Sequence, residues 1–403
     1  MTTRAQLLTR ARIGIMATFG LAGALCAVWT VRVPALTDKL GLDAAQLGVT
    51  VLAWGIGALI SMQVTGRLLT RYGSRTVLRV VGPVTSATLI LIGLAPTYPS
   101  LLLAAVVFGM TFAVLDIAMN AHAALVEQAY GRPLMSGMHA GWSIGAVAGG
   151  LLGAATAYAG WSFTQAVVVF AVVGVPIAAA LGGTYLADPP APATVRAARR
   201  RERLPMAVYL LGAVAFAAFM IEGSVADWSG LYLHDTLGAT EGTAALSYPL
   251  FEAAMIIGRL TGDRVRAALG DRRLLVLGGL ATAAACGLVV AAPAAGWALA
   301  AFVMLGFAVC TVVPVAFSLA GRLGPAAIAR TNSIGYLGLL LGPTVIGPLA
   351  DATSLRTGLA VAVVVALALA LAARALPAGL GERQIGEGMQ PPVRVGALHD
   401  DPS

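Results

Sequence analysis

The chain has 403 residues, of which 59% are hydrophobic and only 11% are charged, and its mean hydropathy is +0.86. A soluble domain of this length has no interior large enough for so much apolar surface, so the composition excludes an ordinary water-soluble protein. The net charge of +8 does not indicate nucleic-acid binding, because no folded soluble surface is available to carry a basic stripe.

Apolar stretches recur along the chain, each about as long as the 20 residues that one helix needs to cross a hydrocarbon core of about 30 Å. They are continuously apolar, whereas the strands of a membrane barrel would alternate over about 10 residues. We therefore predict an all-α membrane protein with twelve transmembrane helices. The expected spans are about 11–35, 46–69, 75–95, 99–126, 137–158, 161–186, 205–234, 243–265, 272–292, 295–321, 328–350 and 355–376.

The basic residues predict the orientation. All of the 26 Lys and Arg residues except Arg32, Lys39 and Arg356 fall at the chain ends or in gaps on one side of the spans. Loops rich in Lys and Arg stay in the cytoplasm, so we expect both termini there. This count places Arg259 with the cytoplasmic residues of the eighth gap. The basic cluster at 196–203 is expected either to contact anionic lipid headgroups or to be a solvated loop that sets the topology.

Motifs recur across the longest gap, 187–204. Gly66-Arg67-Leu68 returns as Gly258-Arg259-Leu260, and Gly109 corresponds to Gly306. Two repeated six-helix halves are typical of secondary transporters, whose solute site lies near the midplane between the repeats. The domains expected are a cytoplasmic N-terminus at 1–10, an N-terminal six-helix bundle at 11–186, a cytoplasmic basic linker at 187–204, a C-terminal six-helix bundle at 205–376 and a disordered cytoplasmic tail at 377–403.

Asp116 is the most deeply placed ionisable residue, because no other charged residue lies within ten positions on either side. An ionisable side chain at the centre of a membrane helix costs about 2.5–3.5 kcal/mol on insertion scales, so its presence favours a function. Asn120 lies one helical turn further along the same face. We predict that Asp116 carries the coupled proton. The alternative is a structural hydrogen bond from a permanently protonated side chain.

Further candidates for the cavity or a gate lie in the first and seventh spans. Glu222 and Asp227 point about 140° apart in a regular helix, so they are not expected to face one spot. Asp227 is expected to contact the solute or to form an outer gate with Arg32. Trp29 and Trp228 occupy equivalent places in the two halves, where they would stack on a sugar ring or anchor the helices at the membrane surface.

Two histidines and one more acid complete the candidates. His139 begins the fifth span, where it would assist proton release or cap the helix at the interface. His122 lies about 120° from the face of Asp116 and is expected to be structural. Glu252, within the eighth span, is expected to have a gate or helix-packing role.

The sequence predicts neither a cofactor nor a metal site. The cysteines, Cys26, Cys286 and Cys310, are scattered within the spans and indicate core thiols. No His, Cys, Asp or Glu cluster has metal-ligand spacing, and no phosphate loop, dinucleotide motif or catalytic triad occurs in a suitable context. We therefore expect no enzymatic activity.

The chain resembles the major facilitator superfamily over residues 11–376. The resemblance implies two six-helix pseudo-symmetric bundles and a cytoplasmic gate loop after the second span of each half. Thr70 replaces the usual acid of the first loop, whereas the second copy keeps its acid, so Asp263 is expected to act alone as the latch. The residues that match these loops are Gly66, Arg71, Gly73 and Arg75 in the first half, and Asp263 and Arg264 in the second.

Within the superfamily, the chain looks like the fucose-permease branch and its uncharacterised bacterial relatives, a resemblance that implies a place in the cytoplasmic membrane of a bacterium. The similar segments are 29–34, 115–120, 226–233 and 335–343. In those permeases the acid at the position of Asp116 is implicated in proton coupling and sugar binding. A second acid of the branch, late in the first span, has no clean counterpart here, because the nearest match is Thr37.

Together these features predict a proton-coupled secondary transporter that moves a small solute, sugar-like or another metabolite, by alternating access. One alternative is a proton-antiport exporter of a drug or secondary metabolite. A remote alternative is a membrane sensor or scaffold that transports nothing. The expected partners are the solute, protons and anionic lipid headgroups, with no nucleic acid, and the expected assembly is a monomer.

Overall fold

The computed structural model describes residues 3–42, 44–188, 204–244, 246–377 and 380. Most of the predicted basic linker, with its arginine cluster, lies outside these residues, as does nearly all of the predicted tail. The expectations about lipid contact by the linker and about the tail therefore stay predictions.

The described part of the chain is helical, and no strand occurs within it. The N-terminal half contains α1 (Arg4–Val31), α2 (Val33–Leu40), α3 (Ala44–Leu94), α4 (Tyr98–Tyr130), α5 (Met135–Tyr158) and α6 (Phe163–Leu181). The C-terminal half contains α8 (Met206–Leu231), the π-helix η1 (Tyr232–Thr236), α9 (Glu241–Ala244), α10 (Ser247–Leu269), α11 (Asp271–Ala291), α12 (Ala295–Val309), α13 (Val312–Arg322), α14 (Pro325–Ala352) and α15 (Leu355–Arg374).

Ten helical segments of the described residues are long and apolar enough to cross a membrane. One of them is α3, which covers two predicted spans. Its backbone breaks between these spans at Gly73, where φ is 77° and ψ is 159°. The charged helix α10 is not among the ten, but it packs between α12 and α5. With α3 crossing twice and α10 crossing once, the structure agrees with the twelve predicted spans and confirms an all-α membrane protein.

Equivalent glycines hold equivalent helices together in the two halves. A Cβ atom at Gly109 would collide with the carbonyl oxygen of Trp54, and one at Gly306 would collide with that of Phe251. The two glycines are 197 residues apart in the sequence, and so are Trp54 and Phe251, whose carbonyl oxygens they face. Glycines on α5 and α14 allow the same close approach to α1 and α8. The repeat in the sequence is therefore also a repeat of helix packing.

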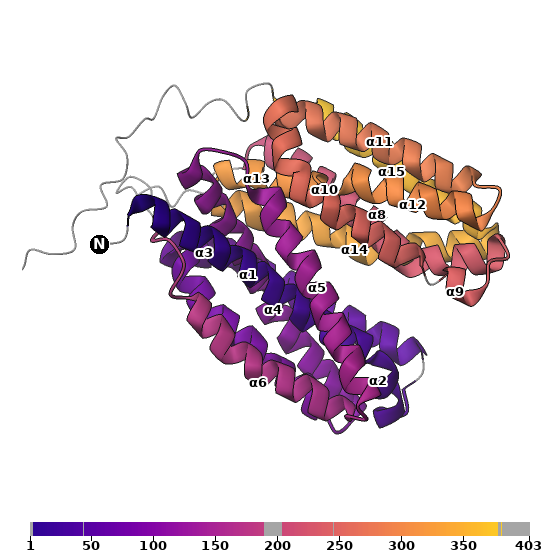
Figure 1. Ribbon diagram of the computed structural model, residues 1–403, viewed down its shortest axis with the longest axis horizontal. Helices are drawn as coiled ribbons and strands as arrows, with labels where there is room; N and C mark the ends of the chain where they lie inside the picture. The colour runs from indigo at the N-terminus through magenta and orange to yellow at the C-terminus, as the bar shows by residue number, and fades with distance from the viewer. Residues whose placement is uncertain (1–2, 43, 189–203, 245, 378–379, 381–403) are drawn as a thin grey trace, which may run out of the picture.

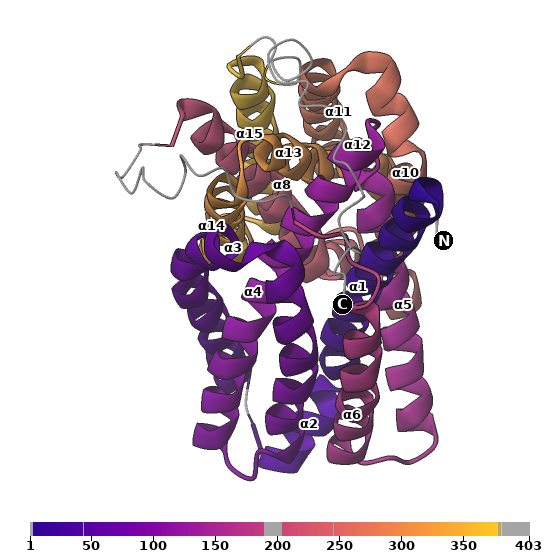
Figure 2. The ribbon, with the colours of Figure 1, turned by 90° about the vertical axis from the view of Figure 1, so that its left-hand side faces the viewer.

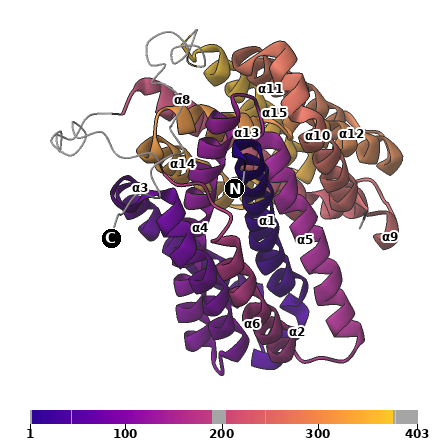
Figure 3. The ribbon, with the colours of Figure 1, turned by 60° about the vertical axis from the view of Figure 1, so that its left-hand side comes forward.

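The two halves meet at one end of the molecule and diverge toward the other, as Figure 1 shows and the turned view in Figure 3 repeats, while Figure 2 shows the N-terminal half below the C-terminal half. We call the first the basic end, because it contains Arg71, Arg132, Arg264 and Arg322. We call the other the splayed end, where α2 and α9 lie. Contacts between the halves join α10 and α13 to α5, and α14 to α3 and α4.

Candidate functional site

A cavity of about 240 Å³ lies between the two halves. Its walls combine aromatic rings with carboxyl, amide and guanidinium groups. The lining residues are Phe19, Cys26, Trp54, Phe112, Asp116, Met119, Asn120, His139 and Trp142 from the N-terminal half, and Phe219, Glu222, Gly223, Ala226, Tyr248, Glu252, Arg259, Val313, Phe317, Tyr336 and Leu339 from the C-terminal half.

Five of the side chains predicted for the cavity or for coupling line this space. Asp116 and Asn120 come from α4, His139 from α5, Glu222 from α8 and Glu252 from α10. The tertiary structure thus brings together residues from four helices that are far apart in the sequence.

The other four predicted residues, Trp29, Arg32, Asp227 and Trp228, are not in the cavity wall. Arg32 is buried, and its Nη2 atom donates a hydrogen bond of 2.5 Å to the carbonyl oxygen of Trp161 in its own half. Asp227 is exposed. Among the described ion pairs none joins Arg32 to Asp227, since the halves diverge toward the splayed end.

Asp116 accepts hydrogen bonds from both halves of the protein. Asn120 Nδ2 donates to Asp116 Oδ1 at 3.1 Å within α4, and Asn332 Nδ2 on α14 donates to Asp116 Oδ2 at 2.6 Å. The Tyr336 hydroxyl, also on α14, lies close to this carboxyl group. Sequence reasoning missed Asn332 and Tyr336 as partners, although Tyr336 lies in a segment that resembles the fucose permeases.

The position of Arg259 differs from the one expected from the sequence. This residue was counted with the cytoplasmic loops, but it is only 5% exposed and lines the cavity. The reason is that α10 continues to Leu269, which leaves Arg259 in mid-helix. Its Nη1 atom donates to Ser143 Oγ at 2.8 Å across the two halves, and its Nη2 atom lies 3.7 Å from Glu222 Oε1. Its Nε atom donates to the Cys310 carbonyl oxygen at 3.3 Å.

A chain of aromatic rings surrounds the acidic groups. The ring centroids of Trp54 lie 6.0 Å from Phe112 and 6.1 Å from Tyr336, and Phe112 lies 5.8 Å from Trp142. On the other side, Phe219 lies 6.0 Å from Tyr336. Offset and tilted ring pairs of this kind stabilise packing and present flat faces to a ligand. None of these rings was predicted, because aromatic residues in a membrane helix face lipid as often as a cavity.

His139, near the start of α5, is buried in the wall of the cavity and is 7% exposed. Its Nδ1 atom donates to the carbonyl oxygen of Met135 at 3.0 Å, and its ring lies 4.8 Å from Phe19 and 6.1 Å from Phe317. His122 lies outside the cavity wall, and its Nε2 atom accepts from a backbone N–H at 3.2 Å.

Asp263 connects the two halves at the basic end, because its carboxylate caps the first turn of α5. Its Oδ1 accepts from the backbone N–H of Ser136 at 3.0 Å, and its Oδ2 from that of Gly137 at 2.9 Å. A carboxylate at a helix N-terminus is favoured by the helix dipole. In the first repeat, Thr70 only donates to the Gly66 carbonyl oxygen within its own helix. The two copies of the gate loop therefore make different contacts.

A buried ion pair lies beside this contact. Arg266 on α10 is 2% exposed, and its Nη1 atom lies 3.1 Å from both carboxylate oxygens of Glu127 at the end of α4. Glu127 also accepts from the backbone N–H groups of Leu134 and Met135 at 2.8 Å. Arg266 further bonds Asp271 at 2.5 Å. Sequence reasoning missed this network, because it treated charges at the ends of spans only as signals of orientation.

Of the remaining gate-loop residues, Gly66 faces Ala326 and Ala329 on α14, and the others lie at the surface or near the break in α3. Arg71 and Arg264 are exposed. Just after the break at Gly73, the carboxylate of Asp188 accepts from the backbone N–H of Arg75 at 2.9 Å. This bond fixes the start of the linker against the N-terminal half.

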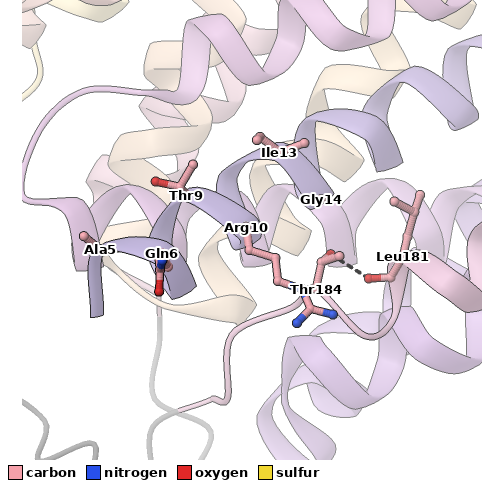
Figure 4. Close-up of a pocket in the computed structure, with 8 residues that line it drawn as sticks. All are labelled: Ala5, Gln6, Thr9, Arg10, Ile13, Gly14, Leu181 and Thr184. Carbon is pink, nitrogen blue, oxygen red and sulfur yellow. Dashed lines mark hydrogen bonds between the residues drawn. The ribbon is translucent and has the colours of Figure 1, made fainter. Parts of the chain in front are cut away.

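A second hollow, of about 520 Å³, lies where the start of α1 meets the end of α6 (Figure 4). Arg10 is the one ionisable side chain in its wall. A hydrogen bond of 2.6 Å joins the Thr184 hydroxyl to the Leu181 carbonyl oxygen there. The residues that line this hollow are Ala5, Gln6, Thr9, Arg10, Ile13, Gly14, Leu181 and Thr184. Its position on one half alone makes it a poorer candidate than the central cavity for a solute passing between the halves.

The described residues contain no group of three or more His, Cys, Asp and Glu side chains that could hold a metal ion. The helical halves with a polar cavity between them define a multi-pass membrane protein of the transporter class.

Comparison with known proteins identifies the family. The sequence profile of the Major Facilitator Superfamily matches residues 13–335. The uncharacterized transporter y4wD of Sinorhizobium fredii is 38% identical over 352 residues, which are 85% of this chain and 92% of that protein. The chain therefore belongs to the major facilitator superfamily, and it is a transporter of that superfamily.

Solved structures agree with this fold. The Escherichia coli fucose:proton symporter FucP superposes with a TM-score of 0.74 at 16% identity, over 91% of this chain and 98% of that one. The proton:xylose symporter XylE superposes with a TM-score of 0.73 at 14% identity, over 94% of this chain and 97% of that one.

Proposed function

We propose that this transporter couples the movement of a small solute to a proton, and that Asp116 carries the proton. The observation that carries the proposal is the position of this carboxyl group in the cavity, where it accepts hydrogen bonds from Asn120 in its own half and from Asn332 in the other. A hydrogen bond to an ionised acceptor is roughly twice as strong as a neutral one. Protonation of Asp116 therefore weakens the bridge between α4 and α14 and lets the halves move.

The arrangement of the halves supports alternating access. The basic residues favour a cytoplasmic location for the basic end, with both termini there, in a bacterial cytoplasmic membrane. At that end Asp263 bonds to α5 and Arg266 pairs with Glu127, whereas the halves diverge at the splayed end. This conformation accordingly exposes the cavity to the outside. Rocking of the two repeats around the central site would expose it to the cytoplasm.

The aromatic rings and polar groups favour a solute with both apolar faces and hydrogen-bonding groups, such as a sugar-like metabolite. Flat rings pack against the apolar face of a sugar, while carboxyl and amide groups bind its hydroxyl groups. The proton-coupled fucose and xylose symporters among the similar structures support this class. An exporter working by proton antiport would use the same cavity, and the direction of proton movement distinguishes the two.

Proton flux in proteoliposomes tests the proposal. With a pH dye inside, a panel of sugars, polyols, amines, aromatic metabolites and amphipathic drugs is added outside. We expect one class to drive proton movement, inward for symport and outward for antiport. Asp116→Asn should abolish it, because the amide keeps the shape but carries no proton. Asp351→Asn, at an exposed position, is the matched control. Solute transport that persists after collapse of the proton gradient would contradict the proposal.

A further inference from the structure

We propose that the solute is an organic cation, an amine whose ammonium group binds at the carboxyl groups of Glu222 and Glu252. Its body would pack against the rings of Trp54 and Phe219. This inference rests on the proposed function in one respect, that the central cavity is the transport site. It adds the charge of the solute and assigns a role to the C-terminal side of the cavity.

The charges in the cavity do not balance. Three carboxyl groups line it, those of Asp116, Glu222 and Glu252, against the single guanidinium of Arg259. If the coupled proton neutralises Asp116 and Arg259 balances one glutamate, one carboxylate remains without a counter-charge. Burial of an unpaired charge is strongly unfavourable, so a cavity built in this way is complementary to one positive charge.

The other polar side chains of the wall do not supply that charge. His139 is buried, takes part in none of the ion pairs of the described residues and donates its Nδ1 proton to the Met135 carbonyl oxygen, so its surroundings favour the neutral imidazole. The Tyr248 hydroxyl lies close to Glu252, and the Tyr336 hydroxyl lies close to Asp116. These hydroxyl groups stabilise carboxylates but are themselves uncharged.

The guanidinium group of Arg259 is already engaged on several sides. It donates to Ser143 Oγ and to the Cys310 carbonyl oxygen, and its remaining nitrogen faces Glu222 at 3.7 Å. That distance is longer than a hydrogen bond, and Glu222 Oε1 has no hydrogen-bond donor among the described residues. Arg259 therefore offers little to an anionic solute, whereas Glu222 offers an open acceptor to a cationic one.

Asn120 gives an independent indication of a ligand that donates hydrogen bonds. This side chain lines the cavity and is 1% exposed. Its Nδ2 atom is committed to Asp116, which fixes the orientation of the amide, and its Oδ1 atom has no partner in the described part of the protein. A buried carbonyl oxygen without a donor is costly, so a bound ligand with N–H or O–H groups would satisfy it.

The rings favour a cation over an anion. An ammonium group within about 6 Å of an aromatic face is attracted by the electrons of the ring, and an anion is repelled. Trp54, Phe219 and Tyr336 lie in one series of neighbouring rings next to the acidic groups. An amine with a hydroxylated or aromatic body therefore matches the carboxylates, the rings and the open acceptor on Asn120.

Binding to the purified full-length protein tests the inference without any transport step. Two sets of ligands keep one scaffold and change only the charge. The first is D-glucosamine, D-glucose and D-glucuronate, and the second is tyramine, 4-ethylphenol and 4-hydroxyphenylacetate. Isothermal titration calorimetry at a pH where the amines are protonated should give the amine of at least one set an affinity at least about tenfold higher than its neutral and anionic relatives.

Two variants then locate the ammonium group. Glu222→Gln and Glu252→Gln should each weaken binding of the preferred amine by about tenfold or more, whereas Asp351→Asn should leave it unchanged. An unchanged melting temperature of the variants shows that they are folded. If neither set shows a preference for the cation, including the case in which none of the six compounds binds, the inference is overturned. Unaltered amine binding in both glutamine variants also overturns it.

The outcomes separate this inference from the proposed coupling. Selective amine binding without proton movement in proteoliposomes would support the cationic solute and contradict proton coupling. Proton movement driven by D-glucose but not by D-glucosamine would support the coupling and contradict the cationic solute.

Discussion

The contact between Asp263 and α5 is expected to hold the basic end closed. Asp263→Asn removes the negative charge that faces two backbone N–H groups, those of Ser136 and Gly137. The asparagine keeps one acceptor oxygen, so one hydrogen bond and the charge at the helix N-terminus are lost. A hydrogen bond to a charged group contributes about 1.5–3 kcal/mol, and a charge at a helix terminus about 0.3–1 kcal/mol.

A loss of about 2–3 kcal/mol from the closed basic end shifts the equilibrium between the two conformations by roughly 30- to 150-fold, since each 1.4 kcal/mol is a factor of ten. A protein that occupies the structure seen here almost completely would then populate the opposite conformation to a measurable extent. The loss applies to this conformation alone, because Asp263 and α5 belong to different halves and separate when the basic end opens.

Distances between spin labels at the splayed end measure this shift. Tyr158 at the end of α5 and Trp297 near the start of α12 are both exposed, and they lie on opposite halves. With Cys26, Cys286 and Cys310 replaced and labels at the two positions, pulsed electron spin resonance should show a new population at shorter distance in Asp263→Asn.

The repeat supplies a matched control for this experiment. Thr70→Val alters the position of the usual acid in the first gate loop, but the Thr70 hydroxyl bonds only within its own helix, so the distance distribution should not change. A distribution in Asp263→Asn identical to that of the unaltered protein would refute the role of this contact. An equal shift in Thr70→Val would show that the effect is not specific to the capped helix.

Three further substitutions test the same structure. Thr70→Asp should restore a latch in the first repeat, because α3 touches the first turn of α14 one helical turn away, at Gly66 and Ala326, and spin-label distances should then show fewer open molecules at the basic end. Gly109→Ala should lower the melting temperature, because its Cβ atom collides with a carbonyl oxygen on α3 and overpacking costs about 1–3 kcal/mol. Gly287→Ala, where a Cβ atom meets nothing within 4 Å, should leave the melting temperature unchanged. Arg266→Ala should destabilise the protein by about 3–5 kcal/mol in denaturation experiments, because Glu127 is left buried without its partner, and adding Glu127→Gln should recover part of the loss.

The sequence by itself determined the class of the protein and its architecture. Hydropathy is a local property of the chain, so apolar runs of the right length predict membrane helices before any packing is known. The repeated glycines predict equivalent helix contacts, and the structure shows them at Gly109 and Gly306. Asp116 was also detectable, because a carboxyl group inside a long apolar run is costly in any tertiary arrangement and therefore stands out.

Only the tertiary structure decided which side chains meet. Hydropathy and helical period do not say which face of a helix points to lipid and which to a neighbouring helix. The hydrogen bond between Asp116 and Asn332 on α14 therefore could not be predicted from the sequence. Arg259 was placed with the loops because a positive charge near a span end is an orientation signal, whereas the packing of α10 buries it in the cavity. Arg32 bonds Trp161 within its own half instead of meeting Asp227 in this conformation. Each of these depends on how two helices distant in the sequence are oriented about their axes, and only packing of the whole bundle sets that orientation.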